Sequence, residues 1–214
     1  MFATDRDLLA LEPNVTRDAA WAGQRLVKGV GGIGGTTLTM TSQDVGVDSA
    51  GVGAGAIVVV GGTGYEVLER TGATTLTVSR VRASGDDPAI MPSPVSGAGV
   101  EVVTYAPQRA LVHAQILRTL GVEPGAIAEP GEASEASILN PGALVMLEAL
   151  GSLHLIFAAA GALAGEGSPV WQRAAMYRER FGAERSRVVV RFDLDGDGLA
   201  DAARRPGIPP LARV

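Results

Sequence analysis

Short β-type segments separated by glycines fill the first half of the chain and constrain its fold most strongly. Six such runs follow one another at about ten-residue spacing, at residues 21–27, 36–41, 56–60, 65–70, 74–80 and 100–104. Two of them, 37–41 and 75–79, alternate apolar and polar residues, which is typical of half-buried strands. Many short strands at this spacing predict a small antiparallel β barrel or sandwich.

The pattern changes to helical spacing after Ala106. Pro107 suits the first turn of a helix, and Gly121 would end it. Asn140 with Pro141 predicts the start of a second helix that runs to about residue 163. Ser168 with Pro169 predicts a third that runs to about residue 191. The second half therefore reads as a bundle of about three helices.

These patterns predict an α+β fold with four segments. They are an N-terminal helix or arm at 1–18, a small β domain at 19–105, a helical bundle at 106–192, and an Asp-rich loop with an extended C-terminal tail at 193–214. Residues 122–137 read as a linker or arm inside the bundle segment. The tail contains three of the chain's prolines, Pro206, Pro209 and Pro210.

The second predicted helix is apolar on nearly every side. Residues 143–165 contain only Glu148 and His154 as strongly polar side chains, and their length approaches that of a membrane span. No basic residues flank the stretch, so burial by protein is the favoured interpretation and a membrane span the alternative. A three-helix domain is expected to be too small to surround this helix. Leu147, Leu150 and Leu155 are therefore predicted to contact neighbouring subunits.

Composition excludes several classes of function. The chain has no cysteine, which rules out a thiolate nucleophile, a disulfide framework and a cysteine-ligated metal. Its net charge of −5 gives no general attraction to nucleic acid. The first residues lack the basic and apolar segments of a signal peptide, so we expect synthesis in a cytoplasm.

Two glycine clusters resemble nucleotide-binding turns, and neither has the required context. Residues 29–34 fit the spacing G-x-G-x-x-G, but a predicted strand follows instead of a helix, so a hairpin loop is favoured. Residues 61–64 follow a strand, but the next segment is too short for a crossover helix, which favours a hairpin turn. His113 and His154 read as packing or interface residues, because neither has a catalytic partner in the sequence. The chain is therefore not expected to be an enzyme.

The third predicted helix is rich in arginine. Between residues 171 and 191 there are six arginines and only two acidic residues, Glu179 and Glu184. Arginine is suited to contacts at protein interfaces. The predicted interface residues on this helix are Arg173, Arg178, Arg180, Arg185 and Arg187.

An aspartate-rich segment follows this helix. Asp193, Asp195 and Asp197, then Gly198 and Asp201, match the opening of a calcium-binding loop. The expected glutamate at the twelfth position is Arg204, so any calcium would be held weakly. The alternative is an Asx turn that ends the helix, with its aspartates solvated or paired to arginine.

These features together resemble a neck protein of tailed bacteriophages, the head–tail connector or adaptor class. The resemblance rests on Tyr177-Arg178-Glu179-Arg180-Phe181 followed by the segment 193–201 of the form D-x-D-G-D-G-x-x-D. The β segment adds 55–60, 65–67 and 74–78, which are similar to modules of virion proteins. The resemblance covers about 107–205 and, more loosely, 50–82.

The resemblance implies a non-enzymatic virion structural protein. It implies a homo-oligomeric ring, twelvefold as in the family, that joins the portal to the tail at the virion neck while DNA passes nearby. It also implies portal and tail proteins as partners, no membrane, and no cofactor other than the calcium considered above. Alternatives are another phage role, as stopper, tail terminator or capsid-associated protein, and, from the 61–64 turn, a nucleotide-binding enzyme.

Overall fold

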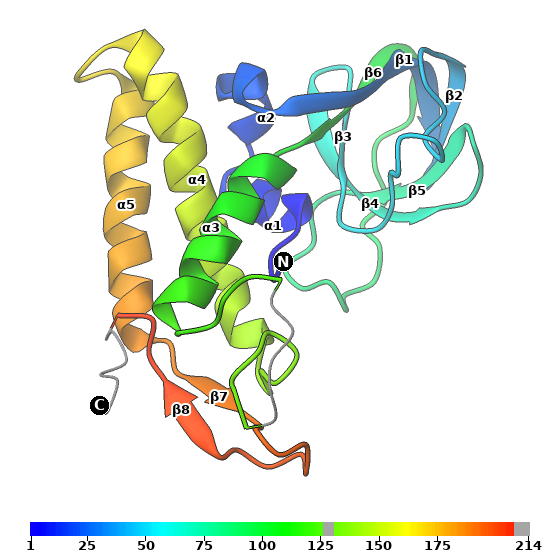
Figure 1. Cartoon of the computed structure of the whole chain (residues 1–214). Helices are drawn as coiled ribbons and strands as arrows, with labels where there is room; N and C mark the ends of the chain where they lie inside the picture. The colour runs from blue at the N-terminus through cyan, green and yellow to red at the C-terminus, as the bar shows by residue number, and fades with distance from the viewer. Residues whose placement is uncertain (126–130, 208–214) are drawn as a thin grey trace. The chain divides into compact units, whose positions relative to one another are not determined.

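The chain divides into two compact units, each with a hydrophobic core of its own (Figure 1). The computed structural model describes residues 1–125 and 131–207. Thr4–Ala106 form the barrel unit, and Met1–Ala3 with Pro107–Val214 form the helical unit. The segment 1–18, expected as a separate arm, is therefore divided between the two units. Residues 126–130 of the expected linker, and Pro209 and Pro210 of the expected tail, lie outside the described residues.

Six antiparallel strands close the barrel in the order β1-β2-β5-β4-β3-β6. Their bounds are β1 Gln24–Gly34, β2 Thr37–Gln43, β3 Ile57–Val60, β4 Thr63–Arg70, β5 Thr75–Ser79 and β6 Val95–Thr104. Every predicted strand run contributes to one of them. Inward-facing residues alternate along β2 and β5, where Leu38, Met40, Leu76 and Val78 are buried in the barrel core. The predicted combination of a small antiparallel barrel with helices is thus confirmed.

The glycines at 29–34 lie within strand β1, so the predicted hairpin loop there is wrong. The register of β1 shifts at Val30/Gly31 against β2 and at Gly31/Ile33 against β6. A Cβ atom at Gly29 would lie 2.0 Å from the Ser42 carbonyl oxygen, and one at Gly31 would lie 2.5 Å from the Thr39 oxygen. Glycine in a strand interior marks bulges and close backbone approach. The cluster therefore serves strand packing.

Two short helices and a turn of 3-10 helix precede the barrel strands. Helix α1, Asp5–Leu11, begins with a capping box, in which Thr4 and Asp7 bond each other's backbone. Helix α2, Val15–Asp18, and η1, Ala20–Ala22, follow. Trp21 lies in η1 and not in the strand predicted from residue 21.

Three longer helices and one β hairpin form the helical unit. They are α3 Ala106–Thr119, α4 Gly142–Ala164, α5 Pro169–Arg187, β7 Val190–Phe192 and β8 Ala202–Arg204. Figure 1 shows α4 and α5 running side by side. Gly121, at φ +72°, follows the end of α3 as predicted. Asn140 does not cap α4 with its side chain, which instead bonds the backbone of Val189 and Arg191 beside β7.

Close packing of α4 depends on two of its glycines. A Cβ at Gly151 would lie 2.7 Å from Val112 and 2.9 Å from Phe181, and one at Gly161 would lie 3.2 Å from the Trp171 Cα. Helices α3 and α5 therefore approach α4 closely. The core of this unit also includes Leu144, Leu147 and Phe192.

Helix α4 has the length and hydropathy of a membrane span, with a mean hydropathy of 1.9 over its most apolar window. However, 61% of that window is buried in the folded chain. Apolar core helices of this kind satisfy the same criterion, so the burial favours protein contacts over lipid.

Candidate functional site

Helix α5 presents an outward stripe of side chains that the described chain leaves exposed or partly exposed. The helix starts as predicted, with Ser168 accepting a hydrogen bond from the Trp171 backbone at 3.2 Å and Pro169 in its first turn. Its buried side carries Ala174, Tyr177 and the half-buried Phe181. A neighbouring stripe, about a quarter-turn around the helix, which we call the arginine face, follows helical spacing: Trp171, Ala175, Arg178, Gly182 and Arg185.

Three of the five predicted interface arginines have partners in the helical unit. The Arg173 guanidinium lies 5.6 Å from the Phe157 ring centre, and that of Arg180 lies 5.7 Å from the Tyr177 ring centre. Arg187 donates to Glu184 at 2.8 Å, a pair three residues apart on the exposed helix surface. These contacts orient the three cations along α5 and give each of them a partner within the chain.

The other two, Arg178 and Arg185, lie on the arginine face. Arg178 is exposed and Arg185 half-buried. Across residues 1–125 and 131–207, neither side chain forms a hydrogen bond or ion pair. Trp171, with 42% of its surface exposed, lies on the same face about 10 Å away along the helix. The face thus combines a partly exposed aromatic ring, which lies close to Gly161 of α4, with two cations that have no partner among the described residues.

The leucines predicted as subunit contacts on α4 are mostly internal. Leu147 is fully buried in the core of the helical unit, and Leu150 is 3% exposed. Leu155 is half-buried and packs against the same core. The folded chain itself covers Leu147 and Leu150, contrary to the expectation that only neighbouring subunits would do so. These two side chains are therefore not a surface for a neighbour.

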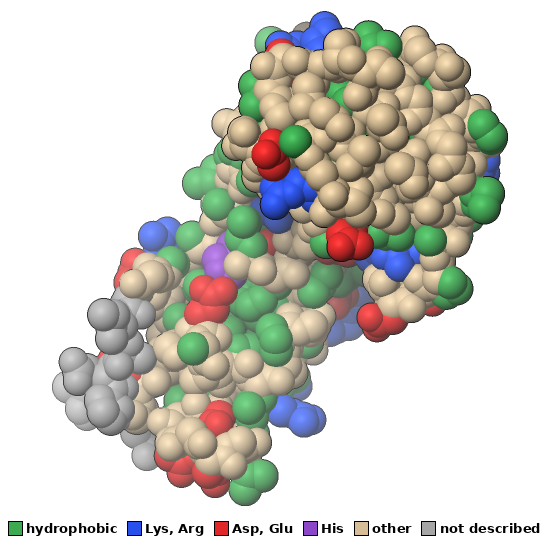
Figure 2. Space-filling model, turned by 90° about the vertical axis from the view of Figure 1, so that its right-hand side faces the viewer, with side chains coloured by type: hydrophobic (Ala, Val, Ile, Leu, Met, Phe, Trp, Pro, Cys, Tyr) green, Lys and Arg blue, Asp and Glu red, His purple; other side chains and the backbone are tan. Residues whose placement is uncertain are grey.

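The aspartate-rich segment forms the tip of the β7–β8 hairpin. Helix α5 ends at Arg187, earlier than predicted, and strand β7 intervenes before Asp193. The segment therefore does not end a helix. We call residues 193–201 the acidic loop. Figure 2 shows acidic side chains gathered at this end of the helical unit beside exposed apolar side chains.

Backbone N–H groups inside the acidic loop fix its shape. Asp193 accepts from Gly196 at 2.6 Å and from Gly198 at 2.9 Å, which holds the pKa of its carboxyl below the ordinary value. Asp195 accepts from the Asp197 backbone, and Asp197 from that of Leu199. Both glycines have positive φ, +82° and +85°, which L side chains rarely adopt.

Three of the four predicted calcium ligands come together. One carboxylate oxygen from each of Asp193, Asp195 and Asp197 lies within 4.8 Å of the other two. Asp201 accepts from the Leu194 backbone at 2.6 Å and lies outside this group. Arg204, at the twelfth position, donates to the Leu120 carbonyl oxygen and stacks on Phe192. One oxygen from each of these three carboxylates is fewer than the six to eight oxygens that calcium takes.

A buried polar cluster of the helical unit was not predicted. Glu148, fully buried on α4, accepts from the backbone N–H groups of Phe2 at 3.0 Å and Ala3 at 3.2 Å. His113 contacts Glu148 through Nδ1 at 2.8 Å and Glu135 through Nε2 at 3.1 Å. The cluster fastens residues 2 and 3 to the helices, which agrees with the packing role expected for His113.

His154 also has a structural contact. Its Nδ1 lies 3.1 Å from the Ala174 carbonyl oxygen, which joins α4 to α5. Gly61 and Gly62 form the β3–β4 turn as predicted, and Thr63–Arg70 is a strand. The helix N-terminus that a nucleotide phosphate requires is thus missing from this turn.

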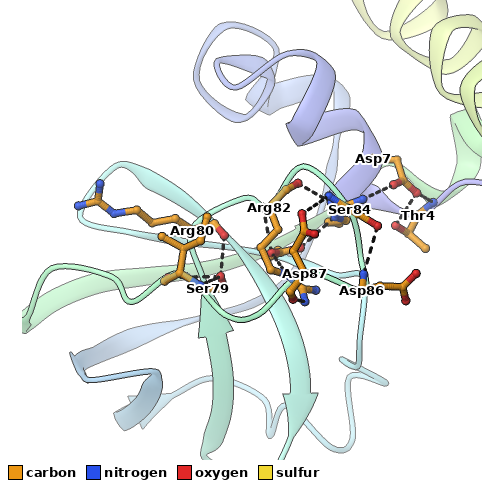
Figure 3. A network of polar contacts seen from close by, with 11 residues as sticks. Thr4, Asp7, Ser79, Arg80, Arg82, Ser84, Asp86 and Asp87 are labelled. Carbon is orange, nitrogen blue, oxygen red and sulfur yellow. Dashed lines mark hydrogen bonds and ion pairs between the residues drawn. The ribbon is translucent and has the colours of Figure 1, made fainter.

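A second unpredicted cluster lies on the barrel unit (Figure 3). Glu66, 1% exposed on β4, accepts from Arg6 Nε at 2.9 Å and Arg82 Nε at 2.6 Å. Arg6 also donates to Asp7 and to the Arg82 carbonyl oxygen, and Arg82 donates to that of Asp87. These side chains line an open pocket of about 490 Å³. Their donors and acceptors are used within the cluster, which ties α1 and the segment after β5 to the barrel.

Comparisons with protein-family models, curated proteins and solved structures give no match. The two buried clusters had no sequence signal, because their residues come from segments far apart in the chain. Arg6 and Glu66 are 60 residues apart, and His113 and Glu148 are 35 apart. The arginine face did have a signal, namely arginine and small residues at helical spacing beside the buried stripe of the helix.

Proposed function

We propose that this chain is a structural protein of the tailed-phage neck, a head–tail connector of the adaptor class. Copies of it would form a homo-oligomeric ring between portal and tail, twelvefold by resemblance to the family, through which DNA passes without sequence-specific contacts. The chain would be made in the host cytoplasm and reside in the virion neck. In this proposal it carries no catalytic site and does not enter a membrane.

The observation that carries the proposal is the uncovered arginine face of α5. Trp171, Arg178 and Arg185 lie on one stripe of a 19-residue helix that is firmly packed on its other side. Aromatic residues and arginine are enriched where proteins meet and are the residue types that contribute most there. A protein whose role is to join others needs such a face on a rigid element.

The sequence resemblance adds support from an independent direction. Tyr177-Arg178-Glu179-Arg180-Phe181 lies in the middle of α5, and the segment 193–201 lies in the hairpin that follows. Both parts of the motif thus belong to the helical unit. Tyr177 is 1% exposed and stacks on Phe157, so it anchors the helix while Arg178 points away from the core.

A measurement of mass in solution tests the proposal. Light scattering or mass photometry of the purified chain, alone and with a portal protein from the same phage, should report a closed ring of many copies. A chain that stays monomeric and also fails to copurify with the portal would overturn it.

The double variant Arg178→Glu, Arg185→Glu sharpens this test. It should prevent assembly while circular dichroism shows unchanged helix content, because neither side chain has an intramolecular partner to lose. Assembly of the variant at the normal mass would remove α5 from the proposed interface. Repeating the measurement with Ca²⁺ and with EDTA shows whether the acidic loop takes a calcium ion that matters for assembly.

A further inference from the structure

We infer that the arginine face of α5 receives the acidic loop of a second copy of this chain. The inference rests on the proposed function and names the two surfaces that would meet in its ring. Both surfaces belong to the helical unit. The arginine face lies on helix α5, and the acidic loop is the tip of the β7–β8 hairpin.

Charge complementarity identifies the occupant. Residues 193–201 contain four aspartates and no basic residue, whereas the arginine face carries Arg178 and Arg185 and no acidic residue. Asp195 and Asp197 are exposed, and in the part of the chain that the structure describes neither pairs with a cation. Each surface therefore has charge without a partner inside its own chain, and each carries the sign that the other lacks.

The apolar groups of the two surfaces also correspond. Leu199 lies among the aspartates with 68% of its surface exposed. Trp171 on the arginine face is 42% exposed and offers a flat apolar surface. Ala175 and Gly182 between the larger residues leave room for a loop to lie against the helix.

Both surfaces combine an apolar group with charges. Arg178 is seven residues from Trp171, about 10 Å along the helix. Leu199 follows Asp197 by two residues, and the Asp197 carboxylate accepts from the Leu199 backbone, so the loop presents an apolar and an acidic group together. The hydrogen bonds inside the loop fix its shape in advance, which lowers the entropy lost on docking.

The two surfaces are different parts of the chain, so the contact is heterologous. Figure 1 shows the β7–β8 hairpin projecting beyond the ends of α4 and α5, and within the described residues no hydrogen bond or ion pair joins 193–201 to the α5 arginines of the same chain. A contact that passes from one copy to the next closes into a ring when its rotation allows. This is the type of contact that the proposed ring requires.

Cysteine cross-linking tests the contact directly, because the chain has no cysteine of its own. Ala175→Cys and Ala200→Cys each place one thiol at an exposed alanine, in the arginine face and in the acidic loop, without changing any charge. The two variants are mixed, with EDTA present, and oxidised. We expect the 175–200 disulfide dimer to exceed that of a control pair, Ala162→Cys with Ala200→Cys, by about tenfold, an effective difference of about 1.4 kcal/mol.

Charge reversal in the same assay separates docking from chance collision. Arg178→Glu in the Ala175→Cys chain should lower the 175–200 yield to that of the control pair, and Asp197→Arg in the Ala200→Cys chain should restore it. Arg118→Glu, a reversal of an exposed arginine on α3, should leave the yield unchanged. A 175–200 yield no higher than the control in the unreversed pair overturns the inference, even if rings form. Strong 175–200 cross-links in a chain that neither closes into rings nor binds a portal support the contact and overturn only the proposed neck function.

Discussion

The Glu66 cluster of the barrel unit and the charged surfaces of the helical unit differ in how their charges are partnered. In the barrel unit, Arg6, Glu66 and Arg82 bond one another at 2.6 to 2.9 Å and Glu66 is only 1% exposed. In the helical unit, Arg178 on α5 and Asp195 and Asp197 in the acidic loop face solvent without such partners. Where burial makes a charge costly the chain supplies its own counterion, and where solvent keeps the charge inexpensive it does not. Charges of the first kind hold a fold together, and those of the second kind are available to another molecule.

The largest effect expected from this comparison is at Glu66. Glu66→Gln keeps the shape but removes the carboxylate that Arg6 and Arg82, each with a 13% exposed side chain, share, and leaves Arg6 only its ion pair with Asp7. We expect the barrel unit to lose about 3 kcal/mol of unfolding free energy. The two tryptophans, Trp21 and Trp171, lie in different units, so a Trp171→Phe background allows fluorescence to follow barrel unfolding in urea.

Glu69→Gln is the matched control, because Glu69 is exposed on the same strand. It should change the urea midpoint little. Equal effects at both positions would mean that Glu66 is not held by its two arginines, and the contrast between the units would fail.

The strands illustrate how much of the fold the sequence determines. Apolar and polar residues alternate at 37–41 and 75–79, and this alternation predicted β2 and β5. Successive side chains of a strand point to opposite faces, and only one face of each of these strands is buried. The glycines at 29–34 were misinterpreted because a bulge and a loop have the same composition. Only the close approach of Ser42 and Thr39 on the partner strand β2 shows that these glycines lie in a strand.

The candidate site was predictable in part, for the same reason. The arginine face depends on one helix, and helical spacing alone places Arg178 and Arg185 on its outer side. The acidic loop was recognised by its aspartates, but its position in a hairpin depends on Leu139 and Ser137 pairing with residues beside β7. The clusters around Glu66 and Glu148 join segments distant in sequence, and no local pattern indicates such pairs.

A smaller effect on stability is expected at Tyr105, a buried side chain whose hydroxyl bonds to the backbone. Tyr105 is fully buried, its hydroxyl donates to the Val15 carbonyl oxygen at 3.0 Å, and burial raises its pKa above the ordinary 10.0. The unfolded chain therefore releases this proton first as pH rises. The contribution to stability is complete below pH 10.0 and is lost as pH rises from there towards the folded-state pKa.

Tyr105→Phe should cost about 1 kcal/mol at neutral pH through the lost hydrogen bond. Above pH 10.0 it should remove a decline of about 1.4 kcal/mol per pH unit from the stability of the barrel unit. Urea midpoints of wild type and variant between pH 7 and pH 11.5 measure both effects. Tyr65→Phe removes a hydroxyl elsewhere in the same unit and serves as control. Parallel pH curves for wild type and Tyr105→Phe would show that another group governs alkaline unfolding.

The smallest change in stability is expected on substitution of Arg178, and an unchanged stability is itself informative. Arg178→Gln removes the charge and keeps an unbranched polar side chain, and since no group in the described chain bonds to Arg178, the unfolding midpoint of the helical unit should stay unchanged. A Trp21→Phe background follows this unit through Trp171. A clear loss of stability would show that Arg178 serves its own fold, as Arg6 does, and would remove it from the proposed interface. An unchanged midpoint together with a lower assembled mass would place its contribution entirely between copies, because a residue that stabilises only the assembly affects only the assembly.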